Sequence, residues 1–235
     1  MTVFRDRAGA GRALAERLAT YAGRPDVLVL ALPRGGVPVA AEVARDLAVP
    51  LDVFLVRKLG VPGQEELAMG AIASGGVRVL NPNVLRGLDL PAAVIEYVAL
   101  QEQAELERRE RAYRAGQPTL DVRGRIVLLV DDGLATGATM RAAAAALRQL
   151  GPARIIVAIP TAARQTCDEI NTAVDEVICL VTPAHFYAVG ASYEDFSATT
   201  DEEVQELLRL ARLECGGIGS TPFPSKHVEA RSGPE

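Results

Sequence analysis

Two adjacent carboxylates followed by a short loop of small residues form the part of the sequence best suited to chemistry. Asp131 and Asp132 directly follow the apolar run Ile126–Val130, and the loop Gly133–Thr139 leads from them into an alanine-rich stretch. The apolar run predicts a buried strand and the alanine-rich stretch predicts a helix. Ligands of open α/β sheets bind at the carboxyl ends of the strands, so a site is expected here.

The loop has the features of an anion site. Gly133 and Gly137 allow backbone amides to approach an anion, and the following helix would direct the positive end of its dipole there. The hydroxyls of Thr136 and Thr139 can donate further hydrogen bonds. Two carboxylates would repel a phosphate unless they bind hydroxyl groups, so the pattern predicts a phosphorylated sugar with neighbouring hydroxyls. A plain β–α turn capped by Asp and Thr is the alternative, which either feature alone would favour.

Two further segments place cations at the ends of predicted strands. Arg34, Gly35 and Gly36 follow the apolar run Val27–Leu32, and adjacent glycines expose backbone N–H groups beside a forked cationic donor. Arg57 and Lys58 follow the run Leu51–Val56, where two cations would meet an anionic leaving group. The alternatives are a glycine-rich turn that begins a helix and a solvated pair of charges.

The segment Val127–Thr139 resembles, position by position, the motif by which type I phosphoribosyltransferases bind 5-phosphoribosyl 1-pyrophosphate (PRPP). The resemblance implies catalytic roles for Asp131, Asp132 and Lys58, the two aspartates holding the 3′- and 2′-hydroxyls of the ribose. It also implies that the 5′-phosphate is held by backbone amides and hydroxyls of Gly133, Leu134, Ala135, Thr136, Gly137, Ala138 and Thr139.

The resemblance extends to the pyrophosphate end of PRPP. It implies that pyrophosphate is bound by Arg34, Gly35, Gly36, Arg57 and Lys58. Family members often carry a strained peptide bond in the first of these loops, and here the bond Arg34–Gly35 is expected to be the one. The segment Lys58–Leu67 is rich in Gly, Pro and Glu, which predicts a mobile loop, and its part Val61–Leu67 falls where the family has its catalytic lid. This part of the chain carries Glu65 and Glu66 but no further basic residue, which is a departure from the family's lid.

Alternating apolar runs and helical periods predict an α/β protein in which helices flank a mainly parallel sheet of five strands. The resemblance implies that this is the type I phosphoribosyltransferase fold. The strands are expected at Val27–Leu32, Leu51–Val56, Ile126–Val130, Ile155–Ile159 and Val177–Val181. The helices are expected at 7–22, Val37–Leu47, 91–115, Thr139–Leu150 and from a capping box at Thr200 to about Leu213. A hairpin is expected from Met69–Ala73 and Val77–Leu80.

A single domain is predicted over residues 1–215, and the resemblance implies a small hood, from about 81–115 and 182–200. Residues 216–235 are rich in Gly, Pro and Ser, which predicts a disordered tail. Phe186 and Tyr187 could stack on a planar acceptor in the hood, although such rings also pack sheet edges. His185 and Tyr193 are expected to be structural.

The net charge of −5 makes nucleic acid an unexpected partner, and no zinc-ligand spacing occurs among three Cys and two His. Charges interrupt the N-terminal stretch, so a cytoplasmic protein without a membrane span is expected. The resemblance implies transfer of 5-phosphoribosyl from PRPP to a nitrogen nucleophile, a nucleobase or related heterocycle, with Mg²⁺ held mainly by PRPP. A PRPP- or nucleotide-sensing regulator is the alternative. Dimers are common in the family, which favours a homodimer.

Overall fold

The computed structural model describes residues 3–88, 90–118 and 120–216. Its centre is a five-stranded sheet in the order β2-β1-β6-β7-β8, in which every neighbouring pair is parallel. The strands are β1 (Val27–Ala31), β2 (Leu51–Val53), β6 (Ile126–Val130), β7 (Arg154–Thr161) and β8 (Glu176–Val181). The predicted parallel five-stranded sheet is therefore confirmed.

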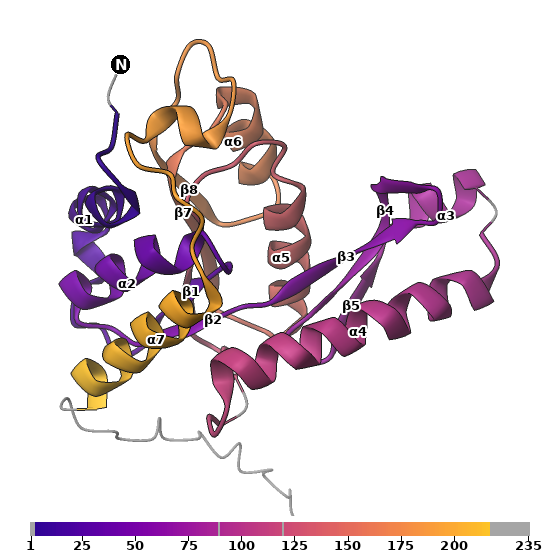
Figure 1. Ribbon diagram of the computed structural model, residues 1–235, viewed down its shortest axis with the longest axis horizontal. Coiled ribbons are helices and arrows are strands. Elements are labelled where there is room, and N and C mark those ends of the chain that lie inside the picture. The colour runs from indigo at the N-terminus through magenta and orange to yellow at the C-terminus, as the bar shows by residue number, and fades with distance from the viewer. Residues whose placement is uncertain (1–2, 89, 119, 217–235) are drawn as a thin grey trace, which may run out of the picture.

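Helices cover both faces of this sheet (Figure 1). One face carries α1 (Arg7–Arg17), α2 (Gly36–Leu47) and α7 (Asp201–Gly216), and the other carries α5 (Ala138–Gln149) and α6 (Arg164–Asn171). Two short 3₁₀ turns are η1 (Ala19–Tyr21) and η2 (Val189–Ser192). The predicted helix start at Thr200 is confirmed, because the backbone N–H of Glu203 donates to Thr200 Oγ1 at 3.1 Å, which is one of the two bonds of a capping box.

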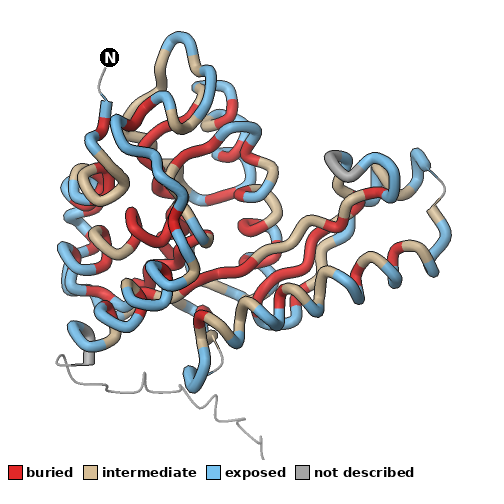
Figure 2. Tube along the Cα trace, in the orientation of Figure 1, coloured by how far each residue is buried: buried red, intermediate tan, exposed pale blue. Residues whose placement is uncertain are grey.

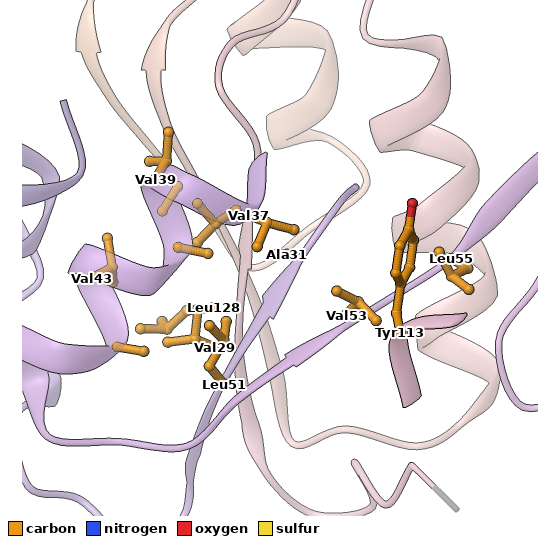
Figure 3. Close-up of a cluster of buried hydrophobic side chains, with 14 of the residues drawn as sticks. Val29, Ala31, Val37, Val39, Val43, Leu51, Val53, Leu55, Tyr113 and Leu128 are labelled. Atoms are coloured by element: carbon orange, nitrogen blue, oxygen red, sulfur yellow. The ribbon is translucent and has the colours of Figure 1, made fainter. Parts of the chain in front are cut away.

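Alternate residues of the central strands enter two different cores. Val29 of β1 packs with α2, whereas Leu28 and Leu30 pack with α5. Figure 3 shows side chains of α2, among them Val37, beside those of β1 and its neighbours. Because both faces are covered, the strand is buried along its whole length, which is why it reads as an unbroken apolar run (Figure 2).

A second, antiparallel sheet projects from the first and is covered on one side by a long helix (Figure 1). Its strands are β3 (Val56–Val61), β4 (Gln64–Ala73) and β5 (Val77–Leu80), and its helices are α3 (Pro82–Leu88) and α4 (Ala92–Arg114). We call these five elements the arm. The predicted hairpin is confirmed, with Ala73 paired to Val77.

The predicted mobile loop Lys58–Leu67 is wrong, because this segment forms most of the β3–β4 hairpin. Leu59, Val61 and Met69 are buried in the arm and supply the apolar face that holds the two strands. The Gly and Pro residues that suggested a loop lie mostly at the turn, where Gly63 has a φ of 79°. The predicted strand Leu51–Val56 is not one continuous strand. Its first residues, Leu51–Val53, form β2, and Val56 begins β3.

The two segments of the predicted hood lie in different parts of the structure. Residues 81–115 form α3 and α4 of the arm, whereas 182–200 run from the end of β8 to the start of α7. Whether they cover a ligand stays a prediction. The predicted tail 216–235 lies, beyond Gly216, outside the described residues. No helix in the described part of the chain is long and apolar enough to cross a membrane.

The arm is anchored to the parallel sheet at the end of α4. Arg114 donates from Nε and from its terminal nitrogen to the carboxylate of Asp52 on β2 at 3.0–3.1 Å. The adjacent Tyr113 hydroxyl donates to Asp201 on α7 at 2.6 Å, and burial together with Asp201 raises the pKa of Tyr113 to about 12. Two successive residues therefore fix α4 to both β2 and α7.

We expect Arg114→Met to lower the free energy of unfolding by about 2–3 kcal/mol, because the Arg114 and Asp52 side chains are only 12% and 19% exposed and the carboxylate would lose charge-assisted bonds. Arg111→Met is the matched control on the same helix, since that side chain is 73% exposed, and it should cost no more than about 0.5 kcal/mol. Urea unfolding measures both. Equal effects of the two variants would show that Arg114 does not anchor the arm.

Candidate active site

The candidate site lies where β1 and β6 end side by side. Ala31 of β1 is in register with Val130 of β6, so the segments that follow both strands leave the sheet at the same edge. The contact between these segments is close. A Cβ on Gly35 would lie 2.1 Å from Asp132 Oδ2, and one on Gly36 would lie 2.9 Å from the Cα of Asp131. Glycine is therefore required at both positions, and the structure brings the loop Arg34–Gly36 against the aspartate pair.

Asp131 and Asp132 are adjacent acids whose side chains are largely buried. The backbone N–H of Asp132 donates to Asp131 Oδ1 at 2.9 Å. Burial, and after it the charge of Asp132, raises the pKa of Asp131 well above its ordinary value. Burial also raises the pKa of Asp132, against the opposing effect of a nearby arginine, Arg7. The pair therefore binds protons more readily than exposed aspartates do.

Arg7 is the site residue that the sequence analysis missed. Asp6 caps α1 by accepting the backbone N–H of Gly9 at 2.7 Å, so the helix begins at Arg7. Arg7 Nε donates to Asp132 Oδ2 at 2.9 Å across 125 residues of sequence. Tyr193, expected to be structural, donates its hydroxyl to the backbone carbonyl of Asp132 at 2.5 Å. Neither residue stands in a pattern with the aspartates, so only the tertiary structure reveals these contacts.

The loop Gly133–Thr139 is hydrogen-bonded to the rest of the protein on one side and exposed to solvent on the other. Leu134 N–H donates to the carbonyl of Thr161 at 3.0 Å, and Thr166 Oγ1 donates to the carbonyl of Ala135 at the same distance. Gly137, at the N-terminus of α5, has a φ of 68°, and a Cβ there would lie 2.8 Å from Thr166. Exposed positions of the loop are Ala135, Thr136 and Thr139. The loop thus presents its outer side, and the start of α5, to solvent.

Both arginines predicted to bind pyrophosphate form ion pairs with acids from other elements. The Arg34 guanidinium lies 3.5 Å from Asp201 at the start of α7. Arg57 Nε donates to Glu102 on α4 at 2.6 Å. Lys58 follows Arg57 on β3, and both line a groove against α4. Of the three predicted cations, Arg34 lies in the loop that contacts the aspartates, while the other two belong to the arm.

The expectation of an unusual peptide bond at Arg34–Gly35 is wrong by one residue. A cis peptide bond joins Pro33 to Arg34. Gly35 itself has helical backbone angles, with φ −58° and ψ −32°, because it is already the N-terminal cap of α2.

The predicted acceptor residues lie on the loop after β8. Tyr187 is 85% exposed, and Phe186 is half-buried. His185, expected to be structural, is exposed on the same loop. Other rings of this region form a stack, in which Tyr193 lies 5.6 Å from Phe4 and 5.1 Å from Phe196 between ring centroids. A planar ligand would meet Tyr187 in solvent rather than in a closed pocket.

The described residues contain no group of three or more His, Cys, Asp or Glu side chains that could hold a metal ion. The two aspartates, which directly precede the loop Gly133–Thr139, could offer carboxylate oxygens to a cation. A divalent cation here would need most of its ligands from a substrate or from water.

Comparison with known proteins assigns the family. The model of the phosphoribosyl transferase domain matches residues 6–195, so the chain belongs to this family. The Mycobacterium tuberculosis protein named "Putative phosphoribosyl transferase Rv0571c" is 46% identical over 240 residues, which cover 100% of this chain and 54% of that protein. The chain therefore spans about half the length of these curated relatives.

Two further similarities bear on fold and function. The crystal structure of the protein TT1426 from Thermus thermophilus is 46% identical, with a TM-score of 0.79, and the match covers 88% of this chain and 97% of that one. The bifunctional protein PyrR of Corynebacterium diphtheriae is 32% identical over 125 residues, which cover 49% of this chain and 64% of PyrR. The fold is thus shared, over most of its length, with a solved protein.

We expect replacement of one buried acid to stabilise the protein in a pH-dependent way. The pKa values of Asp131 and Asp132 are raised on folding, so the pair costs stability as the pH rises from the ordinary carboxyl pKa of about 4 through the raised values. Asp131→Asn keeps an oxygen for the N–H of Asp132 and removes one charge. Its gain in unfolding free energy should reach on the order of 1 kcal/mol at pH 8. Urea unfolding should show that gain disappear towards pH 4, and a gain that does not change with pH would contradict it.

Proposed function

We propose that the protein is a phosphoribosyltransferase that moves the 5-phosphoribosyl group of PRPP to a nitrogen nucleophile and releases pyrophosphate. A nitrogen–C1 bond forms while the C1–oxygen bond breaks, and its electron pair leaves with the pyrophosphate. Membership of the phosphoribosyl transferase domain family supports this proposal. The structural observation that carries it is the contact between the loop Arg34–Gly36 and the pair Asp131 and Asp132.

This contact suits the two ends of PRPP. A sugar that is bound by the aspartates through its 2′- and 3′-hydroxyls would have its 5′-phosphate beside the loop Gly133–Thr139, since that loop follows directly in sequence. Backbone amides at the start of α5 favour such an anion. The anomeric pyrophosphate would extend towards the loop Arg34–Gly36, where the backbone N–H of Gly36 now donates to the carbonyl of Leu32 at 3.1 Å and would have to exchange that bond for one to pyrophosphate.

The aspartates also suit the transition state of this transfer. Positive charge grows on the ribose ring as the pyrophosphate leaves, and carboxylates held beside the ring stabilise it without reorganisation. Catalysis would come from positioning the sugar and from this fixed charge. Asp131 and Asp132 can act in this way only as carboxylates, although their burial favours protonation.

The cations would neutralise the leaving group. Arg34, Arg57 and Lys58 are the residues that we assign to it. The ion pairs of Arg34 with Asp201 and of Arg57 with Glu102 would have to exchange for bonds to pyrophosphate. Both pairs are at least one quarter exposed, so the exchange costs little desolvation.

Magnesium is the cofactor that we assign to this chemistry. A set of hard oxygen donors from the pyrophosphate, the ribose and water suits Mg²⁺. When bound in this way, the ion would lower the charge on the leaving group.

The acceptor that we propose is a nucleobase or a related heterocycle. Phe186 and Tyr187 are the residues proposed to stack on it, and they lie on the loop that precedes η2. Contact of η2 with the site supports this position, since a Cβ on Gly133 would lie 2.6 Å from Val189.

A PRPP- or nucleotide-sensing regulator is the second candidate. The similarity to the bifunctional protein PyrR over half of this chain is the observation that favours it. A regulator would bind PRPP through the same residues without turning it over, so binding and catalysis have to be measured separately.

The direct test is pyrophosphate release from PRPP and Mg²⁺ across a panel of purines, pyrimidines and other heterocycles, alongside calorimetric binding of PRPP. We expect release with at least one acceptor, and Asp132→Asn should lower kcat/KM about 10²–10³-fold, as the loss of a preorganised electrostatic group does. Asp168→Asn on the exposed surface of α6 is the matched control and should have no effect.

Three results are informative. Tight PRPP binding without release across the panel would favour the regulator. Absence of PRPP binding would contradict both the transferase and a regulator that senses PRPP. A folded Asp132→Asn protein with unchanged PRPP affinity and turnover would contradict the assigned role of the aspartates.

A further inference from the structure

Arg7 occupies a position that the proposed reaction leaves unexplained. Its side chain and that of Asp132 are 12% and 14% exposed, so their contact is largely removed from water. A buried ion pair of this kind costs desolvation and gives little net stability. The pair therefore calls for a reason other than stability.

The guanidinium of Arg7 is fixed on three sides. Nε donates to Asp132 Oδ2 at 2.9 Å, and a terminal nitrogen donates to the carbonyl of Ser197 at 2.7 Å. The same group lies over the ring of Phe196, 4.0 Å from its centroid. A planar, forked cation that stacks on a ring and binds two oxygens has one orientation. Arg7 thus holds Asp132 Oδ2 at a defined point.

The residues that contact Arg7 are themselves fixed by contacts between the segments 4–7 and 192–197. Phe4 N–H donates to the carbonyl of Ser192, and Glu194 N–H donates to the carbonyl of Phe4, both at 2.8 Å. Tyr193 stacks on Phe196 and bonds the backbone of Asp132. The segments 4–7 and 192–197 therefore form one clamp around Asp132.

We propose that Arg7 is a positioning residue for Asp132, which it keeps ionised and oriented so that the other carboxylate oxygen, Oδ1, binds a ribose hydroxyl. This inference rests on the proposed function, since the hydroxyl belongs to PRPP. Arg7 does not touch the substrate in this account.

Charge supports the assignment. The titratable and charged groups that face Asp132 in the described structure are Arg7 from α1, Asp131 from its own loop and Tyr193 from the segment after η2. Gly35 and Gly36 bring no charge. Arg7 is the cation of this set, and it opposes the rise in the pKa of Asp132 that burial causes. Without it, both carboxylates would lose the nearby positive charge that lowers their pKa values, and burial would raise those values further.

The test combines two readouts on Arg7→Gln, which keeps a donor and loses the charge. The apparent pKa values of the aspartate pair, followed by carbon-13 NMR of the carboxyl carbons and assigned with Asp132→Asn, should rise. PRPP affinity at neutral pH should fall about ten- to a hundredfold, the factor for one buried charge-assisted hydrogen bond. Arg5→Gln is the matched control, because Arg5 is two residues away and its side chain is 88% exposed. It should change neither readout.

Arg7→Lys separates charge from orientation, and it carries the test if Arg7→Gln does not fold. Lysine restores the charge but cannot bind Asp132 and Ser197 together while lying flat on Phe196. The carboxyl titration should therefore match the wild type, while PRPP affinity stays reduced. Wild-type PRPP affinity in Arg7→Lys would overturn the positioning role.

Failure of this inference differs from failure of the proposed function. An unchanged carboxyl titration in Arg7→Gln overturns the inference whether or not the protein binds PRPP. A wild-type protein that binds no PRPP overturns the proposed function, and a raised titration in Arg7→Gln then still supports the electrostatic effect of Arg7 on Asp132.

Discussion

The rest of the site depends on one close contact, between a glycine pair after β1 and an aspartate pair after β6. A Cβ on Gly35 would lie 2.1 Å from Asp132, so even alanine would displace the carboxylate. The contact forms because Ala31 and Val130 are in register at neighbouring parallel strand ends. It brings the backbone of the loop Arg34–Gly36 against two buried carboxylates. Donors and acceptors in such proximity suit a ligand that carries both anions and hydroxyls.

The contact is unfavourable for the carboxylates, and the surrounding structure offsets that cost. Burial of Asp131 and Asp132 favours their protonation, which would remove the charge that the proposed transfer needs. Arg7 at the start of α1 fixes the carboxylate of Asp132, and Tyr193 between η2 and α7 fixes its backbone carbonyl. This explains why α1 and the segment 192–197 meet at the site. Together they keep an unfavourable arrangement of charge in place.

Much of this could be predicted from the sequence, where local patterns carry the information. The runs Val27–Leu32 and Ile126–Val130 predicted the central strands, because strands buried on both faces are apolar throughout. The β3–β4 hairpin was missed, since its turn residues suggested a loop and its buried face forms by packing against helices such as α4, which is distant in sequence. Arg7 was missed for a similar reason: its bond to Asp132 spans 125 residues, and no spacing rule connects them.

The central claim is that the aspartate pair binds the ribose of PRPP while the two loops bind its ends. A crystal structure of the protein with PRPP and Mg²⁺ tests this most directly. We predict that the ribose hydroxyls lie within hydrogen-bond distance of Asp131 and Asp132, with the 5′-phosphate against the loop Gly133–Thr139 and the pyrophosphate at Gly35 and Gly36. PRPP bound elsewhere, or bound here with a phosphate rather than the hydroxyls at the aspartates, would contradict the account.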